Sequence, residues 1–246
     1  MFGTSAITAL TAQSTREVSG IYPVAASFVA LQIDTTVADI PPDAVKTGML
    51  ADAAIVEAVA EAAARHRFPV LVVDPVMVAT TGGRLLESDA VDAVRARLLP
   101  LATLVTPNAP EAAVLLGRPV ETADDQVTAA RALIDELGAR AALVKGGDLE
   151  GEMLTDVFYD GERIEIFREP RIATTSTHGS GCALASAIAA YLARGATAGA
   201  PPPGAPPTAD ALIAAVTSAR AWVRRGIETA PPLGHGRGPL NLFPHD

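Results

Sequence analysis

Val70-Leu71-Val72-Val73-Asp74 is the stretch that decides the fold class of this chain. A short, mostly β-branched aliphatic run that ends in a carboxylate is typical of a strand buried on both faces. Residues 53–67 before it and 88–98 after it have the apolar spacing of amphipathic helices. A buried strand between two helices predicts right-handed crossover connections and a mostly parallel sheet.

The same alternation of strands and helices continues along the chain. Thr122 and Ser88 are suited to begin helices and Gly138 is suited to end one. Asp160-Gly161 between two β-rich runs predicts an antiparallel hairpin late in the sheet. In chain order, the further elements expected are strands at 101–106 and 141–145, helices at 108–116 and 122–137, hairpin strands at 156–159 and 163–167, and helices at 179–194 and 208–228.

Length and composition favour one α/β domain. The chain has 246 residues, 49% of them hydrophobic and only 4% aromatic, so its core has to be built from Ala, Val, Leu and Ile. A Pro/Ala/Gly-rich segment at about 195–207 interrupts the pattern. We expect a surface insertion there rather than a linker, since too little chain follows for another domain. The expected unit is therefore a single domain, 1–246.

The net charge and the cysteine content restrict the classes of partner and the cellular location that we expect. The net charge is −9 and the pI about 4.9, which argues against nucleic acid, because phosphate backbones need a basic surface. ATP remains possible because its phosphates are held locally. One cysteine permits no internal disulfide, which agrees with a cytoplasmic location. Neither a membrane span nor a signal peptide is evident, so we expect no membrane partner.

Thr177-His178-Gly179-Ser180-Gly181-Cys182 combines a glycine-rich turn with the start of an Ala-rich helix. Free N–H groups at a helix start bind anions, and glycine lets the backbone approach a phosphate closely. Cys182 falls in the first turn, where we expect a lowered thiol pKa and a role in deprotonating or orienting a substrate hydroxyl. There are two alternatives. The segment could be an ordinary tight turn, or His178 and Cys182 could be the base and nucleophile of a cysteine hydrolase, although no third residue that would orient them is evident.

Three further signals follow predicted strands. Lys145-Gly146-Gly147 can reach phosphate oxygens, Asn108 and Glu111 in Thr106-Pro107-Asn108-x-x-Glu111 can cap a helix or hold Mg²⁺, and Asp74 can bind a metal or water. Each has an ordinary structural explanation: a solvated lysine, a capping box or a strand-ending turn. Together they meet at the carboxyl edge of one sheet, where open α/β folds bind ligands. That placement predicts a nucleotide–metal site suited to phosphoryl transfer.

The chain resembles the hydroxymethylpyrimidine/phosphomethylpyrimidine kinases of thiamine biosynthesis, within the ribokinase-like superfamily. Seven ordered blocks carry the resemblance over nearly the whole length. They are SAITALTAQST at 5–15, KTGML at 46–50, DPVM at 74–77, TPNxxE at 106–111, KGG at 145–147, THGSGC at 177–182 and GHG at 234–236. The resemblance implies a three-layer αβα sandwich with a mostly parallel sheet and a late antiparallel hairpin.

The resemblance also implies a reaction and roles for residues. ATP and Mg²⁺ would serve two successive phosphorylations, of 4-amino-5-hydroxymethyl-2-methylpyrimidine and of its monophosphate, and the family suggests a homodimer. The substrate would contact Gln13, Met49 and Val76. The transferred phosphoryl group would lie against Gly179, Ser180, Gly181 and Cys182. Nucleotide contacts would come from Lys145, Asn108, Thr177 and His235, and metal contacts from Asp74 and Glu111.

Two other functions stay open. A pyridoxal kinase of the same superfamily is the first, although Gln13 offers both a donor and an acceptor that suit an aminopyrimidine. A non-catalytic remnant that binds ligand is the second. Family members carry a strand, a Gly-Gly-Ala-Gly segment and a helix before the 5–15 block, about 30 residues in all. We expect this unit upstream of Met1 in a longer reading frame; a true truncation, unstable or inactive, is the alternative.

Overall fold

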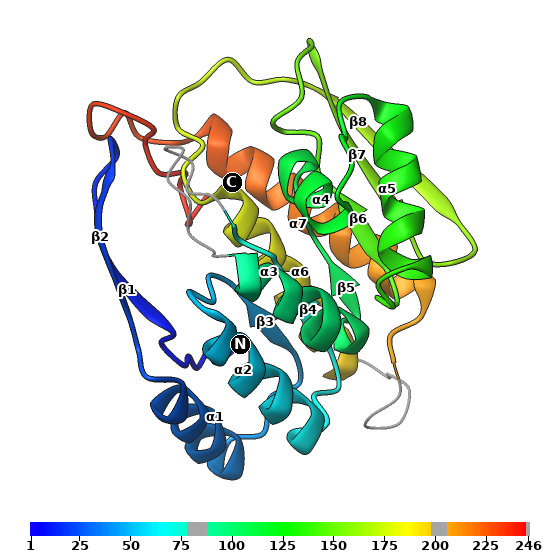
Figure 1. The fold of residues 1–246 in the computed structure, drawn as a ribbon. Coiled ribbons are helices and arrows are strands. Elements are labelled where there is room, and N and C mark those ends of the chain that lie inside the picture. The colour runs from blue at the N-terminus through cyan, green and yellow to red at the C-terminus, as the bar shows by residue number, and fades with distance from the viewer. Residues whose placement is uncertain (78–87, 198–205, 245–246) are drawn as a thin grey trace.

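The computed structural model describes residues 1–77, 88–197 and 206–244. Its centre is a six-stranded sheet in the order β3-β4-β5-β6-β7-β8 (Figure 1). The first four strands are parallel, and β7 and β8 form the antiparallel hairpin expected around Asp160-Gly161. The strands are β3 Val45–Thr47, β4 Leu71–Val73, β5 Leu104–Val105, β6 Ala142–Val144, β7 Met153–Tyr159 and β8 Ile164–Pro170.

Helices cover both faces of this sheet, so the predicted three-layer α/β sandwich is confirmed. On one face lie α6 Ser180–Thr197 and α7 Ala209–Glu228. The opposite face carries the other helical segments, α2 Ala53–His66, α3 Ser88–Ala93, the π-helical turn Val94–Leu98, the 3-10 turn Leu99–Leu101, α4 Ala109–Leu116 and α5 Ala123–Asp135, and α1 Ala26–Asp39 packs on α2 beyond them.

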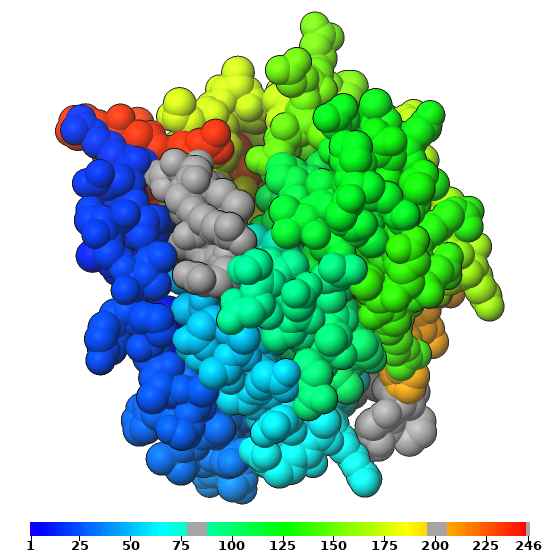
Figure 2. Space-filling view, in the orientation of Figure 1, coloured from blue at the N-terminus to red at the C-terminus, as the bar shows by residue number. Residues whose placement is uncertain are grey.

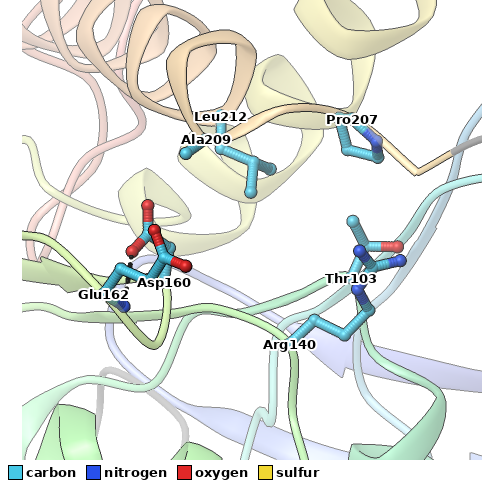
Figure 3. A pocket seen from close by; sticks show the side chains of 7 residues that line it. All are labelled: Thr103, Arg140, Asp160, Glu162, Pro207, Ala209 and Leu212. Carbon is cyan, nitrogen blue, oxygen red and sulfur yellow. Dashed lines mark hydrogen bonds between the residues drawn. The ribbon is translucent and has the colours of Figure 1, made fainter. Parts of the chain in front are cut away.

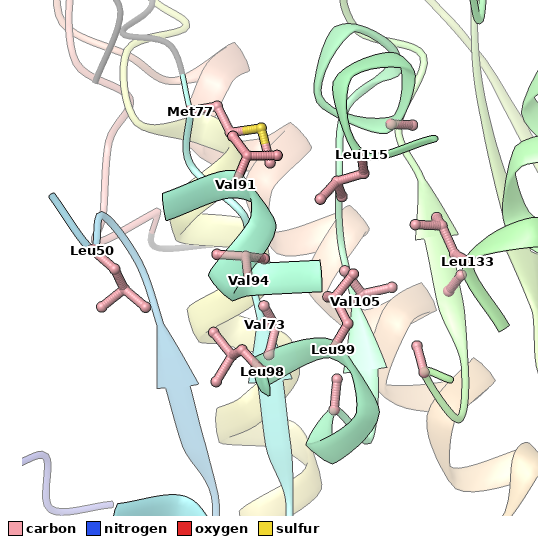
Figure 4. Close-up of a cluster of buried hydrophobic side chains, with 14 of the residues drawn as sticks. Leu50, Val73, Met77, Val91, Val94, Leu98, Leu99, Val105, Leu115 and Leu133 are labelled. Carbon is pink, nitrogen blue, oxygen red and sulfur yellow. The ribbon is translucent and has the colours of Figure 1, made fainter. Parts of the chain in front are cut away.

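Alternation along the strands divides the core into two parts. Within β4, Val72 faces α6 and α7, whereas Leu71 and Val73 pack with the helices of the other face. Figure 4 shows this second part of the core, where leucine and valine side chains of α3 and the turns after it lie over Val73 and Val105. Because both faces are buried, the central strands read as continuous aliphatic runs, as the sequence indicated.

The helix boundaries agree closely with the sequence signals. The Thr122 hydroxyl accepts the N–H of Asp125 at the start of α5, and Gly138 takes a left-handed φ of 77° just after its end. The expected insertion at about 195–207 lies partly outside the described residues; α6 ends at Thr197 and α7 begins at Ala209, capped by Thr208. Within the described ranges, no helix combines the length and hydropathy that crossing a membrane requires.

A separate two-stranded sheet, β1 Ala9–Gln13 and β2 Val18–Pro23, was not foreseen from the sequence. Its turn docks on the carboxyl-terminal loop: Thr15 Oγ1 accepts the amides of His235 and Gly236 at 3.2 and 3.3 Å. A Cβ at position 236 would lie 2.1 Å from the Thr15 carbonyl oxygen, so only glycine fits. Figure 2 shows the carboxyl-terminal segment in red against the end of the blue hairpin.

Candidate active site

Functional side chains gather where the parallel strands end. Asp74 follows β4, Asn108 follows β5 and Lys145 follows β6, because parallel strands present their carboxyl ends at one edge of the sheet. The amino terminus of α6 closes the same edge. A cavity of about 960 Å³ opens there. Every predicted site residue except His235 lines it: Gln13, Met49, Asp74, Val76, Asn108, Glu111, Lys145, Thr177, Gly179, Ser180, Gly181 and Cys182.

Asp74 is the centre of a buried charge cluster. Its Oδ1 accepts the Lys145 ammonium at 3.2 Å and the Thr106 hydroxyl at 3.3 Å. Its Oδ2 lies 3.6 Å from the Lys46 ammonium. Only 2% of the Asp74 side chain is exposed, so the pairing is shielded from water and salt. Two lysines around one carboxylate leave the cluster with a surplus positive charge for an anion.

The ionisation of the cluster follows from these contacts. Burial works against the Asp74 carboxylate, yet the charges of Lys145 and Lys46 hold its pKa below the ordinary value. Burial likewise works against the Lys145 ammonium, but the charges of Asp74 and Glu111 raise its pKa. The aspartate and the lysine therefore stay charged at neutral pH, as charge neutralisation during phosphoryl transfer requires.

Cys182 differs from the sequence expectation. Burial and the neighbouring Asp74 charge raise the pKa of its thiol to about 11, against the lowered pKa predicted from its place in the first helical turn. The prediction of a lowered pKa is therefore wrong. Desolvation and a nearby carboxylate outweigh the helix dipole, which contributes at most about 2 kcal/mol. At neutral pH Cys182 is a thiol, which can donate a hydrogen bond and is a weak base.

Asn108 and Glu111 form a reciprocal capping box at the start of α4. Asn108 Oδ1 accepts the Glu111 N–H, and Glu111 Oε2 accepts the Asn108 N–H, each at 2.8 Å. Both residues also line the cavity, so the capping and ligand-binding interpretations are compatible. Burial raises the pKa of the Glu111 carboxyl to about 7, although the Lys145 charge acts in the opposite direction.

The raised pKa of Glu111 predicts a pH-dependent stability. The folded state holds this proton more tightly than the unfolded state, whose pKa is near 4.5. The resulting stabilisation is complete below pH 4.5 and is lost as the pH rises through about 7, at most about 3 kcal/mol. Glu111→Gln removes the titrating group. Thermal melting from pH 5 to 8 should therefore show a smaller decline for the variant; parallel declines would contradict this assignment.

The glycine-rich turn sets up the amino terminus of α6. Gly179 has a left-handed φ of 77°, which favours glycine, and Ser180 begins the helix. The amides of Gly181 and Cys182 belong to the first turn, where N–H groups have no intrahelical acceptor. A Cβ at Gly181 would lie 3.1 Å from Lys145 Nζ. The helix start and the lysine thus face the same space, which suits a phosphoryl group.

The opposite wall of the cavity comes from the amino-terminal part of the chain. Gln13 lies at the end of β1, and Met49 follows β3. The Thr8 hydroxyl donates to the Met49 carbonyl at 2.6 Å, which ties the two segments together. His235 does not line the cavity; its amide instead helps to hold the hairpin turn at Thr15, while Arg237 of the same loop reaches the cavity.

Several site residues had been given no role from the sequence. Lys46 lies in β3 and is followed by a glycine two positions later, whereas Gly146 follows Lys145 directly; a lysine and a glycine at the end of a strand could have drawn attention to it. Asp156 is a charged residue in a buried strand: it accepts the Gly146 amide at 3.0 Å and the Arg220 guanidinium at 2.8 Å. Arg171 donates to the carbonyls of Gly147, Leu149 and Gly151, so it shapes the loop after Lys145; no local motif marks it.

A second, smaller cavity of about 250 Å³ lies at the opposite edge of the sheet. Thr103 and Arg140 precede β5 and β6, so they mark the amino ends of the strands. Figure 3 shows them across from Asp160 and Glu162 of the hairpin turn, with Leu212 of α7 between. None of the predicted site residues lines this cavity. The large cavity is therefore the candidate active site.

Comparison with known proteins agrees with this geometry. The family model described as phosphomethylpyrimidine kinase matches residues 1–241. The chain belongs to the phosphomethylpyrimidine kinase family. It is 40% identical over 245 residues to the hydroxymethylpyrimidine/phosphomethylpyrimidine kinase of Escherichia coli, with 98% of this chain and 86% of that protein covered. It is 45% identical over 240 residues to the thiamine biosynthesis bifunctional protein of Geobacter sulfurreducens, with 98% of this chain covered but only 46% of that protein.

Solved structures of this kinase class share the fold. The ADP complex of Bacillus subtilis pyridoxal kinase superimposes with a TM-score of 0.83 at 32% identity, covering 98% of this chain and 86% of that one. A phosphomethylpyrimidine kinase from Clostridium difficile gives 0.75 at 31% identity, covering 92% and 87%. The ribokinase-like α/β fold and the kinase family inferred from the seven sequence blocks are therefore confirmed.

Proposed function

We propose that this family member transfers the γ-phosphoryl group of ATP to 4-amino-5-hydroxymethyl-2-methylpyrimidine and then to the resulting monophosphate. The observation that carries the proposal is the buried Asp74–Lys145 ion pair, which lines the large cavity beside the start of α6, with Lys46 on the other side of the carboxylate. A volume of about 960 Å³ suits a small substrate beside a nucleotide. The name of the Escherichia coli relative, a hydroxymethylpyrimidine/phosphomethylpyrimidine kinase that matches nearly the whole chain, supports the substrate.

In the first transfer, the substrate hydroxyl oxygen attacks the γ-phosphorus, the bond to the β-bridging oxygen breaks and ADP leaves. The hydroxyl proton passes to water or to an oxygen of the transferred phosphoryl group. The amides at the start of α6 hold the transferring group, and Lys145 offsets its charge. Cys182, a thiol at neutral pH, orients the attacking hydroxyl rather than deprotonating it. Transition states of this kind are mostly dissociative, so a strong base at the hydroxyl is not required.

The carboxylates fit Mg²⁺, which the kinase family implies. Asp74 Oδ2 is buried without a hydrogen-bond partner among the described residues, and Glu111 lines the same cavity. Mg²⁺ keeps several waters and is usually held by one or two carboxylates together with substrate phosphates. We therefore assign Asp74 and Glu111 to the metal and Lys145, Asn108 and Thr177 to the nucleotide. The ion supplies charge neutralisation between the phosphates when bound.

Selectivity for a pyrimidine over pyridoxal rests on Gln13. Its amide presents a donor and an acceptor, which match the amino group and ring nitrogen of an aminopyrimidine. Gln13→Leu keeps the size and removes both groups, so kcat/KM for the pyrimidine should fall about tenfold or more. A coupled ADP-release assay with the pyrimidine and with pyridoxal tests this. Wild-type protein that prefers pyridoxal would point to the second function, and protein that binds but never transfers would point to a non-catalytic remnant.

We also propose that the chain acts as one kinase domain in a cytoplasmic homodimer. Large apolar side chains exposed on the amino-terminal hairpin, its flanking segments and α1 support association; they are Ile7, Leu10, Ile21, Tyr22, Phe28, Leu31 and Ile40. Leu31→Asp should shift the mass measured by light scattering from dimer to monomer. An unchanged mass, or a monomeric wild type, would count against this surface or against the dimer.

A further inference from the structure

Two lysines stand on opposite sides of Asp74. Lys145 directly follows β6, which is separated from β4 by β5. Its ammonium and the Thr106 hydroxyl both donate to Asp74 Oδ1. Lys46 comes from β3, the strand beside β4, and faces Oδ2. The chain runs on from Lys46 directly to Met49, which lines the wall that also carries Gln13. By its place in the chain, Lys46 is the cation nearer the substrate wall, and Lys145 is the cation beside the helix that holds the transferring group.

Lys46 is poorly used by the protein itself. Its ammonium has three donors, and within the described residues its one partner is Asp74 Oδ2 at 3.6 Å, an ion pair too long for a hydrogen bond. Asp74 Oδ2 correspondingly has no hydrogen-bond partner in the described ranges. Gly48 keeps space beside the ammonium, since a Cβ there would lie 3.1 Å from Lys46 Nζ. The Lys46 side chain keeps 16% of its surface exposed, and its ammonium has unused donors within the described residues.

The two reactions of the proposed function differ in the acceptor. In the first it is a neutral hydroxyl; in the second it is a phosphate that carries up to two negative charges near neutral pH. Bringing that phosphate to the γ-phosphate of ATP costs electrostatic repulsion unless another cation lies between them. Lys145 already offsets the charge of the phosphoryl group that ATP donates. The second transfer therefore needs a cation on the acceptor side of Asp74, which is where Lys46 lies.

We propose that Lys46 binds the phosphate of the monophosphate substrate and so determines whether the enzyme carries out the second phosphorylation. This inference rests on the proposed function. An ionised oxygen of the substrate phosphate attacks the γ-phosphorus, the bond from that phosphorus to the β-bridging oxygen breaks, and ADP leaves. The attacking oxygen already lacks a proton, so this step needs no base. Lys46 donates to the substrate phosphate and reduces its repulsion of the incoming group.

The test compares the two substrates in the same variant. Lys46→Met should lower kcat/KM for the monophosphate about 50-fold more than kcat/KM for the hydroxymethyl substrate, the range expected for a hydrogen bond to a charged group. Lys46→Arg keeps the charge and should restore most of that ratio. Calorimetric titration with the monophosphate should show the same order of affinities. Lys46→Gln replaces Lys46→Met if thermal melting shows that the methionine variant does not fold.

The outcomes separate this inference from the function beneath it. If both substrates lose activity equally in the uncharged variants, Lys46 acts only by holding Asp74, and the inference is wrong while the kinase function stands. If wild-type protein phosphorylates neither substrate, the proposed function fails and this assignment falls with it. A wild type that uses the hydroxymethyl substrate but not the monophosphate would also overturn the assignment.

Discussion

Lys145→Met is expected to lower kcat/KM for ATP about 1000-fold, the scale seen when one preorganised donor to a transition state is removed. The Lys145 ammonium lies 3.2 Å from Asp74 Oδ1, and a Cβ at Gly181 would lie 3.1 Å from it. Its charge is therefore fixed beside the start of α6, where the transferring group passes. No reorganisation is needed during the reaction, which makes a fixed ammonium more effective than a mobile one. Steady-state kinetics with varied ATP measure the effect.

The matched control is Lys46→Met, which removes a lysine from the other side of the same carboxylate. Each variant leaves Asp74 with one ammonium, so their effects on folding should be similar by thermal melting. Lys145→Met should impair both phosphorylations alike, whereas Lys46→Met should mainly impair the second. A loss of less than tenfold in a folded Lys145→Met protein would remove this lysine from the transfer step.

Gly146→Ala is expected to destabilise the fold strongly. A Cβ at this position would lie 2.1 Å from the Thr155 carbonyl oxygen and 2.9 Å from Gln126 Nε2, so β7 has to move. Overpacking against backbone costs up to about 3 kcal/mol, or roughly 6–12 °C in Tm for a chain of this size. The KM for ATP should rise as well, because Lys145 precedes this glycine directly.

Gly147→Ala provides the control for that prediction. It adds the same methyl group one residue further along, where no atom lies within 4 Å of the added Cβ. Its free energy of unfolding should stay within about 0.5 kcal/mol of wild type, as for most exposed substitutions. Equal melting temperatures for the two variants would show that the backbone contact between β6 and β7 is looser than the structure describes.

The central sheet could be read from the sequence because its signals are local. Aliphatic runs such as 70–73, helix caps such as Thr122 and the Asp160-Gly161 turn each depend on residues a few positions apart. The first 50 residues gave no such signal. The hairpin at β1 and β2 has mostly exposed side chains and is held by contacts to Thr15 from residues more than 200 positions away. A local sequence pattern does not predict contacts between residues so far apart in the chain.

The candidate site likewise contains residues that the sequence predicted and others that it did not. The carboxyl-edge rule and the family resemblance placed twelve of the thirteen predicted residues around one cavity. The exception, His235, belongs to the loop that holds the hairpin. The pKa of Cys182 could not be predicted, because it depends on burial and on Asp74, which lies 108 positions earlier in the chain. Asp156 and Arg220 escaped notice for the same reason: their pairing spans 64 positions.

Phosphorus-31 NMR of the complete reaction can follow both proposed phosphoryl transfers in one sample. Wild-type protein is incubated with excess ATP, Mg²⁺ and 4-amino-5-hydroxymethyl-2-methylpyrimidine, and the products are followed with time. We expect a monophosphate resonance that forms first and is then replaced by the paired doublets of a diphosphate ester, with ADP released at each step. Unchanged pyrimidine alongside phosphorylated pyridoxal in a parallel sample, or no phosphorylated product in either, would contradict it.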